Sequence, residues 1–400
     1  MQQPSKLLVD LFKAYYDARK NKRKSPDCLA FEMNYEENIF KLYHEIINNQ
    51  YNISRSLCFI SFNPVQREIF AGNFRDRIVH HLIYNALSSL FERLFIYDDY
   101  SCRLKKGVSL GIRRTDYFIR SCSKNYSQDC WILKLDIKGY FMSIDKKILY
   151  EKIKKVVCDV NNEFNFDKEL LLHLVYPVIF HDPTKHCYMK GIKEDWVGLP
   201  KTKSLFFAKK GKGLPIGNLT SQLFGNVYLN DFDHFVKTKL RCKYYGRYVD
   251  DMVFVHQDKE YLKSIIPKIS NYLKKELDLE IHPKKIYLQY FSKGVLFLGV
   301  VIKPYRIYIG QRNKRSFYKK IMEWNKIIEN QKGQITEDQL KTFLAVLNSY
   351  LGCFYRCSSY KLCQKLVYKN LSSYFAKYIC ITKGYKKAIV SPVFKNVESS

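Results

Sequence analysis

The sequence predicts an α+β fold in which a core of strands and helices precedes a helical segment. Two patterns predict the core: an apolar, β-branched run that ends at Asp136, and an aromatic and β-branched stretch over 243–258 that is typical of a β-hairpin. A third pattern predicts the helical segment, because apolar residues after about residue 304 recur at helical spacing. We therefore place a domain boundary near residue 303.

Amphipathic helices are predicted before and between these strands. Residues 1–55 have a helical pattern, which is clearest over 36–49, and a second amphipathic helix is predicted over 74–95. A third long helix follows a Gly-, Pro- and Asn-rich loop within 213–240. The stretch 261–288 predicts a helix and then a strand. The core therefore alternates helices with strands.

The helical segment follows a short apolar strand predicted over 295–302. Apolar residues over 317–328 recur at helical spacing, and Thr336 and Gln339 have the spacing of a capping box. Both patterns predict helices in basic surroundings.

The charge of the chain predicts a polyanionic partner. Its 400 residues are 46% hydrophobic, enough for one large domain or two to three smaller ones. The 68 Lys and Arg against 38 Asp and Glu give a net charge of +30, which opposes compaction unless a polyanion is bound. Nucleic acid is the first expectation, an anionic membrane surface the second and a basic surface without a partner the third. The 32 Tyr and 27 Phe among the basic residues favour a groove that follows phosphates and stacks bases.

The cysteines predict free thiols rather than disulfides or zinc. The chain has 12 cysteines and no CxxC pair. Cys353, Cys357 and Cys363 are close in sequence, but no histidine accompanies them at a ligand spacing. The chain opens without a secretory pattern, and its longest uncharged runs are shorter than a membrane span. We expect a cytoplasmic protein without a membrane partner.

Three aspartates form the candidate site. Asp136 ends a predicted strand, and Asp250 and Asp251 lie at the turn of the predicted hairpin. The two strand ends can lie side by side in an antiparallel sheet, and converging carboxylates repel one another unless a divalent cation lies among them. Oxygen ligands favour Mg²⁺, and two such ions, roughly 3.5–4 Å apart, would support phosphoryl transfer. An ordinary Asp-Asp turn is the alternative.

These motifs resemble, in order, the blocks of reverse transcriptases over most of residues 67–302. The matching stretches are "REIFAGNFRDRIVHHLI", "YSCRLKKG", "LKLDIKGYF" (motif A), "GLPIGNLTSQ" (motif B), "YVDD" (motif C), "LDLEIHPKKIYL" (motif D) and "GVLFLGVVI" (the primer grip). The resemblance implies a right-hand polymerase, with fingers and a palm built of an antiparallel sheet and helices, and with a C-terminal helical thumb.

The resemblance also implies five parts of the chain. They are an N-terminal helical extension at 1–60, fingers at 61–135, a palm at 136–303 that holds motifs A to E and part of the fingers, a helical thumb at 304–385 and a tail at 386–400.

The catalytic residues are carried over from the same blocks. The resemblance implies that Asp136 and Asp250 bind both of two Mg²⁺ ions, that the carbonyl of Ile137 helps, and that Asp251 is a second carboxylate of motif C and an electrostatic partner. Lys285 corresponds to a lysine that protonates the pyrophosphate leaving group; an ordinary solvated lysine is the alternative.

Residues that contact the incoming nucleotide are implied in the same way. Arg103 and Lys106 correspond to basic fingertip residues on the triphosphate, although Lys105 stands where relatives often have glycine. Phe141 corresponds to a bulky gate against the ribose 2′-hydroxyl; a core phenylalanine is the alternative.

Motif B distinguishes among reverse transcriptases. Ile216, Gly217 and Gln222 follow the pattern of diversity-generating retroelements, whereas retroviral and group II intron enzymes usually have Gln before this glycine. An isoleucine cannot donate the hydrogen bonds of glutamine near the templating pair, so mispaired nucleotides are discriminated less strongly. The resemblance implies an RNA-directed DNA polymerase that makes cDNA and errs at template adenines during mutagenic retrohoming.

The implied partners are template RNA, a primer or cDNA end, deoxynucleotides and a pentameric accessory variability protein, in a bacterial or phage setting. A domesticated bacterial reverse transcriptase in antiphage defence and an inactive RNA-binding scaffold are the alternatives. The lysine-rich segment 190–212 either contacts the template or forms a solvated loop.

Overall fold

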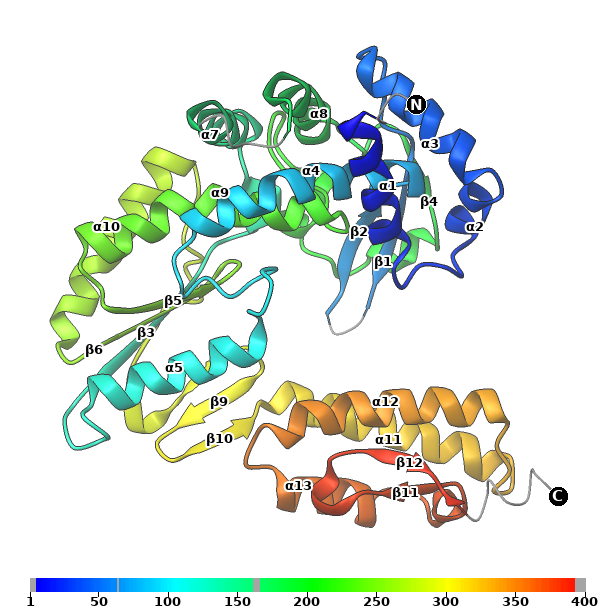
Figure 1. Ribbon diagram of the computed structural model, residues 1–400. Helices are drawn as coiled ribbons and strands as arrows, with labels where there is room; N and C mark the ends of the chain where they lie inside the picture. The colour runs from blue at the N-terminus through cyan, green and yellow to red at the C-terminus, as the bar shows by residue number, and fades with distance from the viewer. Residues whose placement is uncertain (1–4, 63–64, 161–165, 393–400) are drawn as a thin grey trace. The chain divides into compact units, whose positions relative to one another are not determined.

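A computed structural model describes residues 5–62, 65–160 and 166–392 (Figure 1). The chain divides into two compact units. The first comprises Met1–Gly111 and Leu133–Leu288, and the second Ile112–Ile132 and Gln289–Ser400.

Short helices open the first unit, as the pattern over 1–55 predicted. They are α1 (Lys6–Arg19), α2 (Pro26–Glu32) and α3 (Tyr35–Ile47). The Ser5 hydroxyl caps the first of them by accepting a hydrogen bond from the Leu8 amide at 3.3 Å. This helix packs against α4 (Phe74–Leu94), which confirms the helix predicted over 74–95.

A small sheet follows, with the strand order β2–β1–β4. Its strands are β1 (Ser56–Ser61), β2 (Arg67–Ala71) and β4 (Cys187–Met189). The first two pair antiparallel, and β4 joins β1 in parallel, with Tyr188 opposite Leu57. Strand β4 was not predicted, because three residues are too few to show an alternating pattern.

One buried carboxylate holds the segment 190–212 against this sheet. Glu68 of β2 is 1% exposed. Its oxygens accept hydrogen bonds from Trp196 Nε1 at 2.8 Å, the Ser204 hydroxyl at 2.8 Å and the Leu205 amide at 2.6 Å. The segment is therefore fixed by these donors, while most of its lysines stay exposed.

The central sheet of the first unit has the strand order β5–β6–β3–β7. Its strands are β3 (Trp131–Asp136), β5 (Tyr244–Tyr248), β6 (Asp251–His256) and β7 (Tyr287–Tyr290). β5 and β6 pair antiparallel with Tyr248 opposite Asp251, so the predicted hairpin is confirmed. Residues 252–255 are fully buried, which explains the apolar run that follows the two aspartates.

Helices cover this sheet and connect its strands. They are α6 (Tyr140–Ser143), α7 (Lys146–Asp159), α8 (Lys168–Phe180), α9 (Leu219–His234), which continues into a π-helical turn (Phe235–Lys239), and α10 (Lys259–Leu277). The Asp145 carboxylate caps α7 by accepting from the amides of Lys147 and Ile148. In Figure 1, α9 and α10 lie along the same side of the sheet, and α10 packs on β6.

The second unit combines a small sheet with helices. Its elements are α5 (Val108–Cys122, most of which belongs here), β8 (Val295–Phe297), β9 (Val300–Lys303), β10 (Arg306–Ile309), α11 (Gln311–Asn330), α12 (Glu337–Tyr355), α13 (Tyr360–Gln364), a π-helical turn (Lys365–Lys369), β11 (Ile379–Ile381) and β12 (Ala388–Val390). Thr336 and Gln339 form the predicted capping box of α12. The expectation of an all-helical segment after 304 is wrong, because β10 extends the β8–β9 hairpin and β11 pairs with β12. The five predicted parts of the chain stay a prediction.

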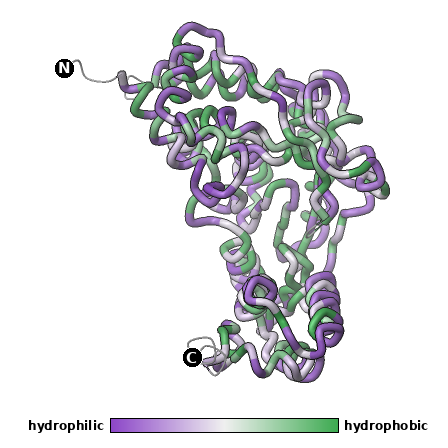
Figure 2. The backbone as a smooth tube through the Cα atoms, turned by 90° about the vertical axis from the view of Figure 1, so that its right-hand side faces the viewer, coloured by the Kyte–Doolittle hydropathy of each residue, from purple (hydrophilic) through white to green (hydrophobic). Residues whose placement is uncertain are grey.

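Hydrophobic and hydrophilic residues are interleaved along the coloured part of the chain in Figure 2. In α11, Phe317, Ile321 and Ile328 are buried in the core of the second unit, and Trp324 packs against it. Within the part of the chain that the structure describes, no helix is both long and apolar enough to cross a membrane.

Candidate functional site

The three predicted aspartates lie at the ends of neighbouring strands. Asp136 is the last residue of β3, and Asp251 is the first residue of β6, which lies beside β3 in the sheet. Val249 and Asp250 form the turn, so the turn is centred one residue earlier than predicted. The charges of Asp136 and Asp251 both raise the pKa of Asp250, so the structure brings the three carboxylates together.

Asp136 has one oxygen that is paired and one that is not. The side chain is mostly buried, and its Oδ2 lies 2.7 Å from Lys285 Nζ. Its Oδ1 is buried and has no hydrogen-bond partner. Since a buried acceptor is usually satisfied, this orphaned oxygen indicates a place for a ligand.

The environment of Asp250 disfavours its charged form. Burial, followed by the charges of Asp136 and Asp251, raises the pKa of Asp250 to about 7. Burial also raises the pKa of Asp251, while Lys134 Nζ, 3.1 Å from Asp251 Oδ1, opposes this shift. Two lysines therefore supply part of the positive charge that three adjacent carboxylates require.

A divalent cation fits this donor set. Hard carboxylate oxygens, one of them orphaned, are the ligands that Mg²⁺ prefers, and a bound cation would favour the charged form of Asp250. Among residues 5–62, 65–160 and 166–392, however, no three His, Cys, Asp or Glu side chains are arranged so that they could hold a metal ion together as they stand. The lysines beside Asp136 and Asp251 occupy part of the space around these carboxylates.

The segment after α10 fixes the end of β3. The His282 amide donates to the carbonyl of Asp136 at 2.8 Å, and Ile137 forms an isolated bridge with Ile281. The amide of Lys285 donates to the carbonyl of His282 at 2.9 Å. These bonds bring Lys285 to Asp136 across a long stretch of sequence, as the predicted catalytic role requires. The predicted role of the Ile137 carbonyl stays a prediction.

The loop before α9 is fixed to β2. The Phe70 amide donates to the carbonyl of Ile216 at 2.8 Å. Gly217 has a φ of +129°, and a Cβ at this position would lie 2.8 Å from the carbonyl oxygen of Phe70. Only glycine allows this approach. The side chain of Ile216 packs on the cluster that contains Phe70, whereas Gln222 is exposed on α9.

Phe141 packs beside α9. Its ring lies 5.4 Å from that of Tyr140, and a Cβ added at Gly225 would lie 3.3 Å from Phe141 Cε1. The ring is partly exposed, which is compatible with a gate and with a core position.

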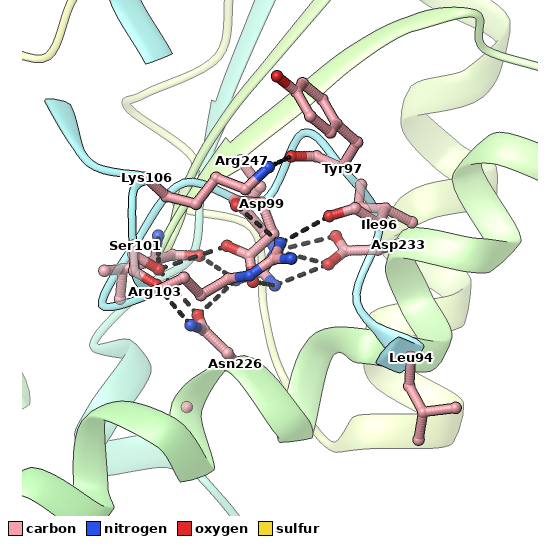
Figure 3. Close-up of polar contacts among 12 residues, drawn as sticks. Leu94, Ile96, Tyr97, Asp99, Ser101, Arg103, Lys106, Asn226, Asp233 and Arg247 are labelled. Atoms are coloured by element: carbon pink, nitrogen blue, oxygen red, sulfur yellow. Dashed lines mark hydrogen bonds and ion pairs between the residues drawn. The ribbon is translucent and has the colours of Figure 1, made fainter. Parts of the chain in front are cut away.

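Arg103 and Lys106 make contacts within the chain (Figure 3). The Arg103 side chain is 5% exposed; it forms a bidentate pair with Glu92 and also donates to the carbonyl of Ile96 at 2.7 Å. Lys106 Nζ donates to the carbonyl of Tyr97 at 3.0 Å and lies 3.5 Å from the centre of its ring. Their contact with a triphosphate stays a prediction, and for Arg103 it would require exchanging these partners.

Residues 66–302 match the family model described as reverse transcriptase (RNA-dependent DNA polymerase). The chain belongs to this family. The match covers more than half of the chain and includes all three aspartates, and the α+β polymerase fold class predicted from the sequence is confirmed. Reverse transcriptases normally use divalent metals, in agreement with the oxygen donors of the site.

The curated relatives of this chain are distant. Protein YkfC of Escherichia coli (strain K12) is 22% identical over 257 residues, which are 56% of this chain and 60% of that protein. The putative COX1/OXI3 intron 2 protein of Saccharomyces cerevisiae (strain ATCC 204508 / S288c) is 24% identical over 282 residues, 60% of this chain and 32% of that protein. The chain thus spans less than two thirds of the length of each.

Similar solved structures include telomerases. The telomerase of Candida albicans in complex with a TWJ fragment of telomeric RNA has a TM-score of 0.47 at 12% identity, over 85% of this chain and 60% of that one. The truncated apo telomerase of Candida tropicalis has a TM-score of 0.45 at 13% identity, over 69% of this chain and 60% of that one.

Sequence reasoning missed a buried charge cluster next to the motif C hairpin of the reverse transcriptase. Arg247 and Asp233 are fully buried and paired, with Asp99 beside them. The available signal was an arginine inside a strand that precedes a buried run. Its partners lie far away in the sequence, so this signal did not identify them.

Proposed function

We propose that this reverse transcriptase is an RNA-directed DNA polymerase that makes cDNA from a template RNA. The observation that carries the proposal is that the carboxylates of Asp136 and Asp250 lie near each other. One oxygen of Asp136 has no hydrogen-bond partner, and the pKa of Asp250 is raised. Such pairs of carboxylates at strand ends suit in-line phosphoryl transfer between a primer and a nucleotide. We keep fingers at 61–135, palm at 136–303 and thumb at 304–385 as part of this proposal.

Two Mg²⁺ ions are proposed as the cofactor, held by Asp136 and Asp250 with help from the Ile137 carbonyl and Asp251. When bound, they would supply the positive charge that activates the primer 3′-hydroxyl and neutralises the triphosphate. The carboxylates orient this charge, and Lys285 donates a proton to the leaving pyrophosphate, for which its ammonium group at Asp136 is suitably placed.

Nucleotide selection is proposed to depend on three further regions. Phe141 excludes a ribose 2′-hydroxyl, Arg103 and Lys106 contact the triphosphate, and Gly217 lets the loop before α9 lie close to β2. Gln222, which is exposed on α9, contacts the nucleotide or its template partner.

The direct test is primer extension. The protein is incubated with an RNA template, an annealed DNA primer, deoxynucleotides and Mg²⁺, and the products are separated by length. We expect template-dependent extension that ribonucleotides do not replace. A folded protein that binds RNA but extends no primer on any template would instead be an RNA-binding scaffold.

We further propose that the enzyme is of the diversity-generating type and acts in the cytoplasm of a bacterial or phage-infected cell. The support is the Ile216-Gly217 pattern, together with an Ile216 side chain that packs on apolar neighbours and offers no hydrogen bond to a base pair. Template RNA, the cDNA end and a pentameric accessory protein are the proposed partners. A template and variable repeat that differ at adenines in the flanking DNA would favour this role over antiphage defence.

Ile216→Gln is expected to raise fidelity. The new amide can hydrogen-bond near the templating pair, so a correct pair gains more than a mispair, and the error frequency should fall by roughly ten- to a hundredfold. The measurement is sequencing of cDNA made by both forms on one template. Ile216→Leu, which stays apolar, is the control and should keep the original error spectrum. Equal error spectra for the Gln variant and the natural enzyme would refute the explanation.

RNA affinity is expected to fall steeply with salt. The net charge of +30 predicts that binding releases many counterions, so the affinity should drop by about 10²-fold or more between 50 and 200 mM salt. Fluorescence anisotropy of a labelled single-stranded RNA gives the slope. A change below about twofold would show that the basic surface does not bind phosphates.

A further inference from the structure

Arg247 occupies an unusual place for an arginine. It lies within β5, and its side chain is fully buried. Its guanidinium forms a bidentate pair with the carboxylate of Asp233 in α9, with Nε 2.8 Å from Oδ1 and Nη2 2.7 Å from Oδ2 (Figure 3). The Tyr245 hydroxyl donates to the same carboxylate at 2.6 Å. Because a buried charge is tolerated only with good partners, this geometry leaves the guanidinium little freedom to move.

The loop at 96–106 lies against the same strand. The Tyr100 amide donates to the carbonyl of Arg247 at 2.9 Å, and the Arg247 amide donates to the carbonyl of Asp98 at 2.9 Å. Asp99 Oδ2 lies 3.3 Å from Arg247 Nη2. Burial raises the pKa of Asp99, which Arg247 opposes. Residues 98–101 of the loop and the arginine are therefore buried together.

These buried residues reach the turn that carries Asp250. Arg247 Nη1 donates to the carbonyl of Val249 at 3.0 Å, and the Val249 amide donates to the Ser101 hydroxyl oxygen at 3.2 Å. Ser101 is itself fixed to Asn226 of α9: its hydroxyl donates to Asn226 Oδ1 at 2.8 Å, and Asn226 Nδ2 donates to its carbonyl at 2.7 Å. The amide of Val249 is thus held by the 96–106 loop, and its carbonyl is held by the side chain of Arg247, which belongs to the hairpin itself.

Val249 needs such contacts because of its backbone conformation. Its φ is +55°, whereas that of Asp250 is not positive. A positive φ at the first central residue alone is typical of a type II′ hairpin turn, in which glycine is the preferred residue. A β-branched side chain in this region is strained and persists only where its surroundings impose the conformation.

We propose that Arg247 and Ser101 are positioning residues that hold Val249 in its left-handed conformation and thereby place Asp250 beside Asp136. This inference rests on the proposed polymerase function. Asn226, which holds Ser101, and Asp233, which holds Arg247, lie on the same helix, so α9 fixes both residues that contact the turn. Because α9 begins at the loop that is fixed to β2, the same helix links the nucleotide-binding loop to the catalytic carboxylate.

The test compares Ser101→Ala in two backgrounds. In the natural protein, Ser101→Ala is expected to lower kcat for primer extension about tenfold and to change the KM for deoxynucleotides less than about twofold, because Asp250 is displaced while nucleotide contacts persist. In a Val249→Gly background the same substitution should lower kcat by less than about twofold, since glycine adopts a positive φ without strain. Ser264→Ala removes an exposed hydroxyl that donates to the Tyr261 carbonyl in the preceding helical turn, and is the matched control.

A second readout does not depend on activity. Hydrogen exchange of the peptide that covers residues 244–256 should be faster in Ser101→Ala, because the Val249 amide loses its acceptor. Equal losses of kcat in both backgrounds, or unchanged exchange in a folded Ser101→Ala protein, would overturn the positioning role. A natural protein that extends no primer, while Ser101→Ala still speeds exchange, would overturn the polymerase function and leave the contact intact.

Discussion

Asp250→Asn is expected to abolish cDNA synthesis, with primer extension on Mg²⁺ reduced by about 10³-fold or more. The asparagine side chain has the same size as that of aspartate but lacks its negative charge. The site then has two carboxylates instead of three near the end of β3. RNA binding should change little, because the basic surface is untouched. The measurement is extension of a DNA primer on an RNA template, with RNA affinity determined in parallel.

The same substitution is expected to stabilise the metal-free protein. Burial and the adjacent carboxylates raise the pKa of Asp250 to about 7, above the ordinary value of 3.8. Between about pH 4 and 7, Asp250 keeps its proton in the folded protein but has lost it in the unfolded chain. The free energy of unfolding therefore falls as the pH rises through this range. Asn removes this penalty and should add about 1–3 kcal/mol to the free energy of unfolding at pH 8 and almost nothing at pH 4.

Urea unfolding in EDTA at both pH values measures this gain. Asp231→Asn is the matched control, because Asp231 is an exposed carboxylate that pairs with Lys152 at the surface. It should alter neither extension nor stability by much. A variant at position 250 that retained more than a few percent of activity with Mg²⁺ would contradict the assignment of this carboxylate.

Arg247→Met is expected to destabilise the protein by about 3–5 kcal/mol. The substitution fills the space but leaves Asp99 and Asp233 buried without their cation. A buried carboxylate without a cation is more stable when protonated, so the variant should be destabilised least at low pH. The loss of stability should therefore be larger at pH 8 than at pH 5, whereas a simple packing defect would cost the same at both pH values.

The matched control is Arg19→Met, at a partly exposed arginine paired with Glu32. Its cost should be much smaller than that of Arg247→Met, because solvent reaches this pair and screens it. Unfolding by urea at the two pH values measures both variants. If Arg247→Met cost no more than Arg19→Met, or if its cost did not change with pH, the buried charge cluster would not stabilise the fold in the way described.

Patterns that repeat locally were predictable from the sequence. The helix over 74–95 and the capping box at Thr336 follow from spacing alone, and the structure confirms both. The proximity of Asp136 and Asp250 could be predicted because Asp136 ends one strand and Asp250 directly precedes another, and the apolar pattern of both strands is clear. Strands of three or four residues, such as β4 and β10, carry too few side chains to show such a pattern.

Contacts between distant residues were not predictable from local patterns. Arg103 matched a triphosphate contact by its position in a motif, yet its guanidinium is engaged by Glu92 and backbone carbonyls. The turn of the hairpin was placed one residue late, because a valine with a positive φ contradicts the usual preference for glycine. Val249 keeps its positive φ because Arg247 and Ser101 bond to its backbone, and both of these residues are in turn fixed to α9.

The carboxylate of Glu68 limits how far this protein can be shortened. Its three hydrogen-bond donors all come from the segment between motifs A and B. A shorter protein made by deleting that segment would take all three donors away from Glu68. Trimming would therefore have to change Glu68 at the same time, since this residue and the segment form a single module.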